Sequence, residues 1–225
     1  MTGSLVSPAT RARVRDLATP VATALGRLGL SPNALTLIGF AGTCLAAWAA
    51  AGQRWQLAGV LVIAFGIFDL FDGTLARATG RASRLGAFLD STFDRAGEAI
   101  VYLGIAAGSL AAGFESGAVL AGAAMAASFM VSYVRAKAES LGFGAGSGMA
   151  AIGLAPREVR TVLLAIGLVL APVAFVDPLP GGPLTVALAA IAILATLTTV
   201  QRILHVATAS RREDRRAAPP HMKDG

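Results

Sequence analysis

Long apolar runs separated by short polar stretches make up most of this chain. From residue 33 onward the pattern predicts six helices of about 20 residues, the length that a helix needs to cross a bilayer. Ser31 and Pro32 are typical of a helix start and predict where the first of these helices begins. We therefore expect an all-α membrane protein with six transmembrane helices in one domain, residues 31–208. The predicted spans are 33–51, 56–78, 85–111, 117–138, 158–176 and 183–206.

The segment before the first span has a different pattern. Between residues 11 and 30, apolar residues recur at helical spacing and are accompanied by four arginines. This combination predicts an N-terminal juxtamembrane amphipathic helix on the membrane face, bent or interrupted at Pro20. A surface helix packed on the protein's own core would show the same pattern, and both can hold. We expect residues 1–10 and the basic tail, 209–225, to be disordered.

Composition and charge placement support a membrane location. The chain is 55% hydrophobic and only 14% charged, whereas soluble domains have about 25% charged residues. Its net charge of +6 could suggest a nucleic-acid partner, but the basic residues are concentrated in alternate connections. The N-terminal arm, 77–84, 135–160 and the tail hold nearly all of them, and the opposite connections hold only Arg54. The positive-inside rule then places both termini at the cytoplasmic side of a cell membrane and argues against nucleic acid.

Four aspartates interrupt the apolar pattern around the second connection. Asp69 and Asp72 are spaced i, i+3, and Asp90 and Asp94 are spaced i, i+4, so each pair lies on one face of its helix. Ionised aspartates in a membrane segment are costly unless they are compensated. A divalent cation held between the two helices would compensate them, and an all-carboxylate set suits Mg²⁺ or Mn²⁺.

The residues around these carboxylates form a longer motif. Gly73 removes a side chain beside them, and Arg77 is placed to bind a phosphate. In full, the segment reads D-x2-D-G-x2-A-R-x8-G-x3-D-x3-D and resembles the signature of the CDP-alcohol phosphatidyltransferases. The resemblance implies a metal-dependent transferase of phospholipid biosynthesis that moves a phosphatidyl group from CDP-diacylglycerol to an alcohol and releases CMP. Buried aspartate–arginine pairs, a cation transporter and a non-catalytic membrane scaffold are the alternatives.

The resemblance also implies a role for each polar residue near the motif. Asp69, Asp72 and Asp90 are the expected metal ligands, and Asp94 is the expected catalytic base, a further metal ligand, or both. Glu98, one turn beyond Asp94, either supports the site by hydrogen bonding or is protonated. Asn33 and Ser83 could instead serve only as a helix-start residue and a loop serine. The residues expected to bind the CDP-lipid donor are Pro32, Asn33, Ala34, Leu35, Gly73, Arg77 and Ser83.

Basic residues near the ends of the last three spans suggest an acceptor site. Their arrangement is similar to that of the actinobacterial phosphatidylinositol-phosphate synthases, which implies a phosphorylated polyol acceptor, inositol phosphate in particular, and a homodimer. The loop 155–160 departs from the usual sequence of those enzymes, so glycerol 3-phosphate is the alternative acceptor. The positive-inside bias alone would also place cations here. The residues expected to bind the acceptor phosphate are Arg135, Lys137, Arg157, Arg160 and Arg202.

Overall fold

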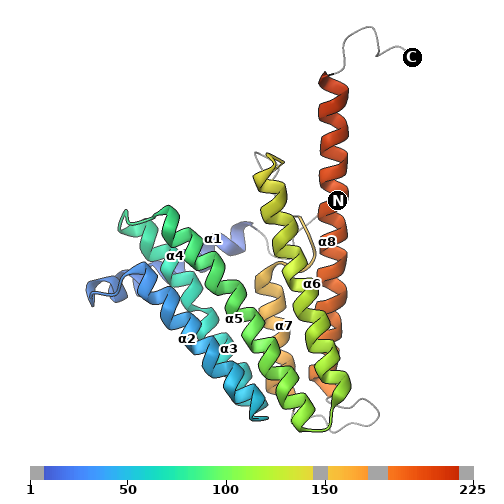
Figure 1. Ribbon diagram of the computed structural model, residues 1–225. Helices are drawn as coiled ribbons and strands as arrows, with labels where there is room; N and C mark the ends of the chain where they lie inside the picture. The colour runs from blue at the N-terminus through green and yellow to red at the C-terminus, as the bar shows by residue number, and fades with distance from the viewer. Residues whose placement is uncertain (1–7, 144–151, 172–181, 218–225) are drawn as a thin grey trace.

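The computed structural model describes residues 8–143, 152–171 and 182–217, and every regular element in these ranges is an α-helix (Figure 1). Most of the helices run side by side along a common direction as a bundle. The helices are α1 (Pro8–Arg27), α2 (Pro32–Ala51), α3 (Trp55–Gly66), α4 (Phe68–Ala78), α5 (Arg84–Ala111), α6 (Glu115–Ser140), α7 (Arg157–Leu170) and α8 (Gly182–Ala217).

Helices occupy every predicted span. The second predicted span is divided at Ile67 into α3 and α4, although Ile67 itself keeps helical backbone angles. The end of the fifth predicted span, residues 172–176, lies outside the described residues. Four stretches are long and apolar enough to cross a membrane, namely α2, α3 with α4, α6 and α8. The all-helical class is therefore confirmed, and six transmembrane helices remain a prediction.

Both ends of the chain contain more helix than expected. α1 begins at Pro8, so residues 8–10 are helical, and residues 1–7 lie outside the described part. α8 continues to Ala217, so the predicted disorder of the tail is wrong for 209–217, while 218–225 lie outside the described residues. The apolar pattern does not predict this extension of α8, because residues 209–217 are mainly charged or small.

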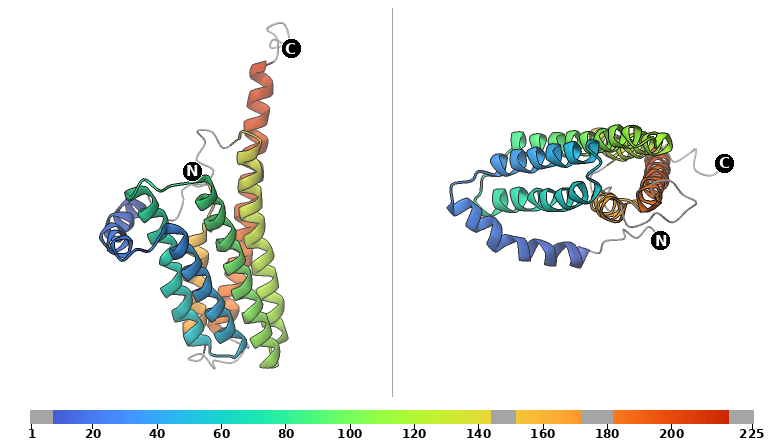
Figure 2. Two further views of the ribbon diagram at one scale, coloured as in Figure 1. Left: turned by 60° about the vertical axis from the view of Figure 1, so that its left-hand side comes forward. Right: turned by 90° about the horizontal axis from the view of Figure 1, so that it is seen from below.

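The N-terminal helix lies across one end of the bundle (Figure 2). It runs through Pro20 without interruption, and it packs against α4, where Ala22 meets Leu35 and Leu75 in a small buried cluster. This helix is therefore packed on the protein's own core, one of the two arrangements that its sequence pattern allowed. Contact with a membrane face remains a prediction.

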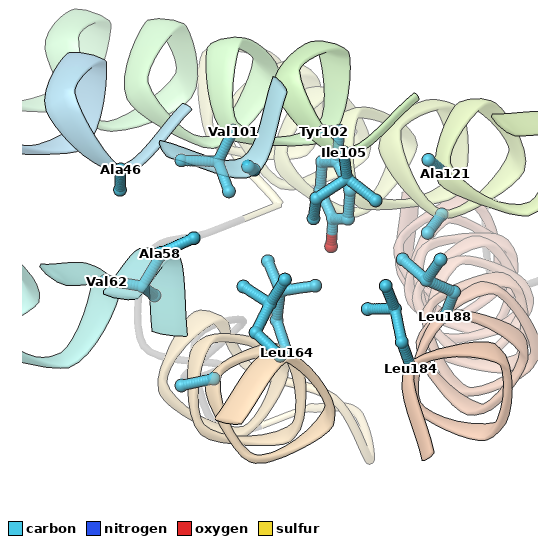
Figure 3. Packing of buried hydrophobic residues seen from close by; sticks show 14 of the residues in the cluster. Ala46, Ala58, Val62, Val101, Tyr102, Ile105, Ala121, Leu164, Leu184 and Leu188 are labelled. Carbon is cyan, nitrogen blue, oxygen red and sulfur yellow. The ribbon is translucent and has the colours of Figure 1, made fainter. Parts of the chain in front are cut away.

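Close packing between α2 and α5 holds the centre of the bundle together. A Cβ atom added at Gly104 of α5 would lie 2.3 Å from the carbonyl oxygen of Ala47 on α2, so only glycine allows this approach. Beside this seam Tyr102, Leu164 and Leu188 belong to the main apolar core (Figure 3). This core includes the C-terminal part of α2 and the N-terminal part of α3. The polar residues of the motif gather at the opposite end, near the start of α2.

Candidate active site

The carboxylate-bearing helices meet at an open pocket of about 600 Å³. Asp72 of α4 and Asp90 of α5 both line it, together with the connection between the two helices. Ser83 ends this connection and caps α5, since its hydroxyl accepts a hydrogen bond from the backbone N–H of Gly86 at 3.0 Å. The expected N-terminus of the first span is confirmed in the same way, because Ser31 accepts from the N–H of Ala34 at 3.2 Å. The N-termini of α2 and α5 thus both border the pocket.

Asp72 is the most enclosed of the pocket carboxylates, with 4% of its surface exposed. Its Oδ2 atom accepts a 2.7 Å hydrogen bond from the hydroxyl of Thr36 on α2, and its Oδ1 atom accepts from the backbone N–H of Gly73. Thr36 also lines the pocket. The sequence analysis missed Thr36, although a polar residue one turn after Asn33 in an apolar helix could have drawn attention to it.

Asp94 lies one turn beyond Asp90 on α5 and has different partners. Its Oδ1 atom lies 2.8 Å from Nη1 of Arg157, and its Oδ2 atom lies 3.2 Å from Nη1 of Arg95. Arg157 belongs to α7, so its ion pair with Asp94 joins the carboxylate motif to a residue 63 positions further along the chain.

The described side chains include three of the four motif carboxylates. Asp69 is on α4, one turn before Asp72, but its side chain is not among those described. Among the described side chains, no group of three or more aspartate, glutamate, histidine or cysteine residues is close enough to hold a metal. Among the described side chains, the carboxylates that line the pocket are Asp72 and Asp90, and their hard oxygen atoms suit Mg²⁺ or Mn²⁺.

Five of the seven residues predicted to bind the donor line the pocket with Asp72 and Asp90. The guanidinium of Arg77 extends back over Gly73, 3.4 Å from where a Cβ atom on that glycine would lie. The other two predicted residues have packing or backbone roles, since Leu35 is fully buried against Leu75 and Ala34 bonds to the cap of α2. The five that line the pocket are Pro32, Asn33, Gly73, Arg77 and Ser83.

A second, smaller cavity lies among α2, α3, α5 and α7. Arg157 and Arg160 line it, and Glu98 faces both from α5. Arg160 forms a two-pronged ion pair with Glu98, with Nε–Oε1 and Nη2–Oε2 distances of 3.0 and 3.1 Å. Glu98 therefore acts through hydrogen bonding to a buried cation, which is one of the two roles that the sequence left open.

The remaining predicted acceptor residues line neither cavity. Arg202 is 4% exposed and donates to the carbonyl oxygens of Ile152 and Val131, at 3.0 and 2.7 Å. Arg135 pairs with Glu139 one turn away at 2.8 Å, and Lys137 is exposed on the same helix, α6. The five predicted cations are thus distributed over three helices, and in the described contacts Arg157 pairs with the motif carboxylate Asp94.

Arg160 and Arg202 also fix the segment that leads into α7. Arg160 donates to the carbonyl oxygen of Ala155 at 3.0 Å, and Arg202 holds that of Ile152. The hydroxyl of Thr198 on α8 accepts from the N–H groups of Leu154 and Ala155 at 3.1 and 3.0 Å. This segment is therefore anchored to α8 and α7 just before Arg157.

Long apolar helices, with carboxylates and arginines gathered at one end, are typical of a membrane protein. Residues 29–209 match the CDP-alcohol phosphatidyltransferase family. The chain belongs to this family, as its motif predicted.

Curated relatives share much of the sequence. The archaetidylinositol phosphate synthase of Pyrococcus horikoshii is 41% identical over 156 residues, which cover 69% of this chain and 78% of the relative. The phosphatidylinositol phosphate synthase of Streptomyces avermitilis is 35% identical over 222 residues, covering 96% and 88%.

Solved structures show the same fold. The phosphatidylinositol phosphate synthase of Mycobacterium tuberculosis with CDP-DAG bound superposes with a TM-score of 0.73 at 28% identity, covering 86% of this chain and 94% of that one. The same enzyme in complex with manganese and citrate gives a TM-score of 0.72 at 29% identity, covering 85% and 89%.

Proposed function

We propose that this protein transfers the phosphatidyl group of CDP-diacylglycerol to a phosphorylated polyol, with inositol phosphate favoured, and releases CMP. The observation that carries the proposal is the open pocket, where Asp72 and Asp90 share one lining with five residues expected to bind the donor. The relatives named as inositol-lipid phosphate synthases, and the neighbour with CDP-DAG bound, support this choice of donor and acceptor.

The pocket suits a pyrophosphate for two reasons besides its carboxylates. The N-termini of α2 and α5 border it, and backbone N–H groups and the helix dipole make such termini favourable for anions. Arg77 adds a guanidinium that can form paired hydrogen bonds with phosphate oxygens. These groups would hold the CDP end of the donor, while the acyl chains remain among the apolar helices.

Asp69, Asp72 and Asp90 would hold Mg²⁺ or Mn²⁺, with Asp94 as a further ligand, and the manganese in the M. tuberculosis enzyme supports this choice. The bound cation supplies charge neutralisation and a fixed orientation for the pyrophosphate. Asp72 is already oriented by Thr36 and Gly73. A carboxylate that is held in place before its ligand arrives needs less reorganisation on binding.

Asp94 is the proposed base. The acceptor hydroxyl attacks the phosphorus on the lipid side of the pyrophosphate, its proton passes to a carboxylate oxygen of Asp94, and CMP departs with the bonding electrons. Arg95 and Arg157 form ion pairs with this carboxylate and so orient it. The second cavity supports an acceptor site beside it, because Arg157 lines that cavity and contacts Asp94.

A purified-protein assay tests the whole proposal. CMP release should require CDP-diacylglycerol, inositol phosphate and Mg²⁺ or Mn²⁺ together, and chelation of the metal should stop it. The absence of CMP release under all conditions would favour the transporter or scaffold alternatives. Release that is independent of any acceptor would indicate hydrolysis of the donor and contradict the proposed transfer. A clear preference for glycerol 3-phosphate would keep the reaction and change the product.

We also propose six transmembrane spans, with the pocket facing the cytoplasm. Thr79 and Ala112 form a matched pair for this test, since both are exposed C-cap residues with nearly equal backbone angles, φ −99° and −86°. In a Cys44→Ala background, Ala112→Cys should react with an impermeant thiol reagent on intact cells, and Thr79→Cys should react only after lysis. The opposite labelling would reverse the topology.

The resemblance further implies a homodimer in a cell membrane. Chemical cross-linking in native membranes should give a discrete product of twice the monomer mass. A chain that remains monomeric at every cross-linker concentration would contradict this proposal.

A further inference from the structure

Thr36 occupies an unusual position for a threonine in an apolar helix. It is 7% exposed, lies on α2, and faces Asp72 across the interface between α2 and α4. The two residues are 36 positions apart in sequence, and the distance from the hydroxyl to Oδ2 of the carboxylate is 2.7 Å. A bond from a hydroxyl to an ionised carboxylate is stronger than one between neutral groups.

The same hydroxyl has a second acceptor within reach. Threonines in helices usually donate to the carbonyl oxygen four residues earlier, and for Thr36 that atom, in Pro32, lies 3.2 Å away. A hydroxyl has one proton to donate, so the shorter contact to a charged oxygen takes it. Thr199 on α8 provides the contrast, because it is equally buried and bonds only to the carbonyl of Ala195 among the contacts of the described residues.

We propose that Thr36 is a positioning residue for the metal site, which holds the Asp72 carboxylate in the orientation that binds the cation. This inference rests on the proposed function and deepens it, since it concerns the same metal site. Each carboxylate oxygen has two lone pairs, so Oδ2 can accept from Thr36 and still face a cation. The hydroxyl thus restricts rotation of the carboxylate without occupying all its binding capacity.

The β-branched side chain makes threonine suitable for this role. Val, Ile and Thr have restricted χ1 rotation in a helix, so the Thr36 hydroxyl is held toward Asp72 more firmly than a serine hydroxyl would be. Partners that orient metal ligands typically change metal affinity or activity by about 10- to 100-fold when they are removed. Loss of this hydroxyl should therefore be visible in metal binding before any turnover is measured.

The test uses Mn²⁺ titration of the purified full-length protein, with free Mn²⁺ measured by electron paramagnetic resonance. Thr36→Val, which keeps the shape and removes the hydroxyl, should weaken Mn²⁺ binding about tenfold. Thr36→Ser, which keeps the hydroxyl, should stay within about twofold of the wild type. Thr199→Val, the matched control that also removes a buried helix hydroxyl, should bind Mn²⁺ like the wild type. If Thr36→Val fails to fold, Thr36→Ala is titrated in its place.

A second comparison tests whether Thr36 acts through Asp72. Adding Thr36→Val to an Asp72→Ala protein should cause no further loss of Mn²⁺ affinity, because the carboxylate it orients is already missing. An additional loss of similar size, or a Thr36→Val protein with wild-type affinity, would overturn the proposal. If the wild type binds Mn²⁺ but releases no CMP, the proposed function fails and the Thr36 inference stands. If the wild type binds no Mn²⁺, the metal site and this inference fail together.

Discussion

The candidate site has two contrasting halves. One is the pocket lined by Asp72 and Asp90, and the other is the second cavity with its arginines. In the pocket, the predicted donor-binding residues are near the surface, and the cation Arg77 is exposed. At the second cavity Arg160 is 2% exposed and its described contacts are with Glu98 and Ala155. The first half is arranged to receive a ligand. The second half already uses much of its charge to hold the protein together.

This contrast separates two uses of the same residue type. An exposed arginine beside a pocket contributes little to stability, because surface ion pairs are worth about 0–1 kcal/mol. A buried arginine cannot be removed without leaving its carboxylate unpaired, which is strongly destabilising. Substitutions on the two sides should therefore differ in whether they first change stability or first change substrate use.

The largest expected effect concerns the fold. Arg160→Gln leaves Glu98 unpaired in a buried setting, and we expect a loss of about 3–5 kcal/mol in the free energy of unfolding. Thermal unfolding in detergent would measure it. Arg135→Gln is the matched control, because its pair with Glu139 is exposed and its loss should cost under about 1 kcal/mol. Equal melting temperatures for the two variants would contradict a structural role for Arg160.

The next effect concerns catalysis. Asp72→Asn or Asp90→Asn keeps the side-chain shape and removes a negative charge from the metal site. We expect turnover to fall at least about 100-fold, or about 2.7 kcal/mol in barrier height, while the melting temperature shows that the protein is folded. Glu115→Gln makes the same chemical change at the start of α6 and should leave turnover intact. Near-normal turnover in either aspartate variant would reject the metal site.

Arg202 tests whether a buried arginine can both stabilise the fold and bind a substrate. Its described contacts use Nε and Nη1, and a guanidinium has five N–H donors. If it also contacts the acceptor phosphate, Arg202→Gln should raise the KM for the acceptor about tenfold, or about 1.4 kcal/mol. The KM for CDP-diacylglycerol should stay unchanged. A lower melting temperature with equal changes in both KM values, or none, would assign Arg202 to the fold alone.

The smallest effect is expected on the donor side. Arg77 is exposed, and among the described residues its guanidinium makes a long contact with Thr74, at 3.5 Å. Arg77→Gln should leave the melting temperature unchanged and raise the KM for CDP-diacylglycerol about fivefold, or roughly 1 kcal/mol. Steady-state kinetics with each substrate varied in turn would show it. A change in the KM of the acceptor instead would exchange the proposed roles of Arg77 and Arg202.

The sequence alone determined the helical class, most of the helix positions, and a motif whose residues line one pocket. The apolar runs require helices, because a backbone in lipid must satisfy its own hydrogen bonds. The motif from Asp69 to Asp94 lies on two consecutive helices joined by a short connection, so its spacing nearly fixes its geometry. Ser31 and Ser83 could be recognised because helix caps depend on local backbone geometry.

Only the tertiary structure decided which residues from distant helices meet. The pairing of Asp72 with Thr36 depends on how α2 packs against α4, and the pairings of Asp94 and Glu98 with Arg157 and Arg160 depend on where α7 lies. Sequence spacing is uninformative about such contacts, since helices in lipid select partners by close packing of small residues and by polar bonds between them. The cations predicted at one end of the spans lie on α6, α7 and α8, and their binding of an acceptor stays a prediction. Their partners could be read only from the folded chain.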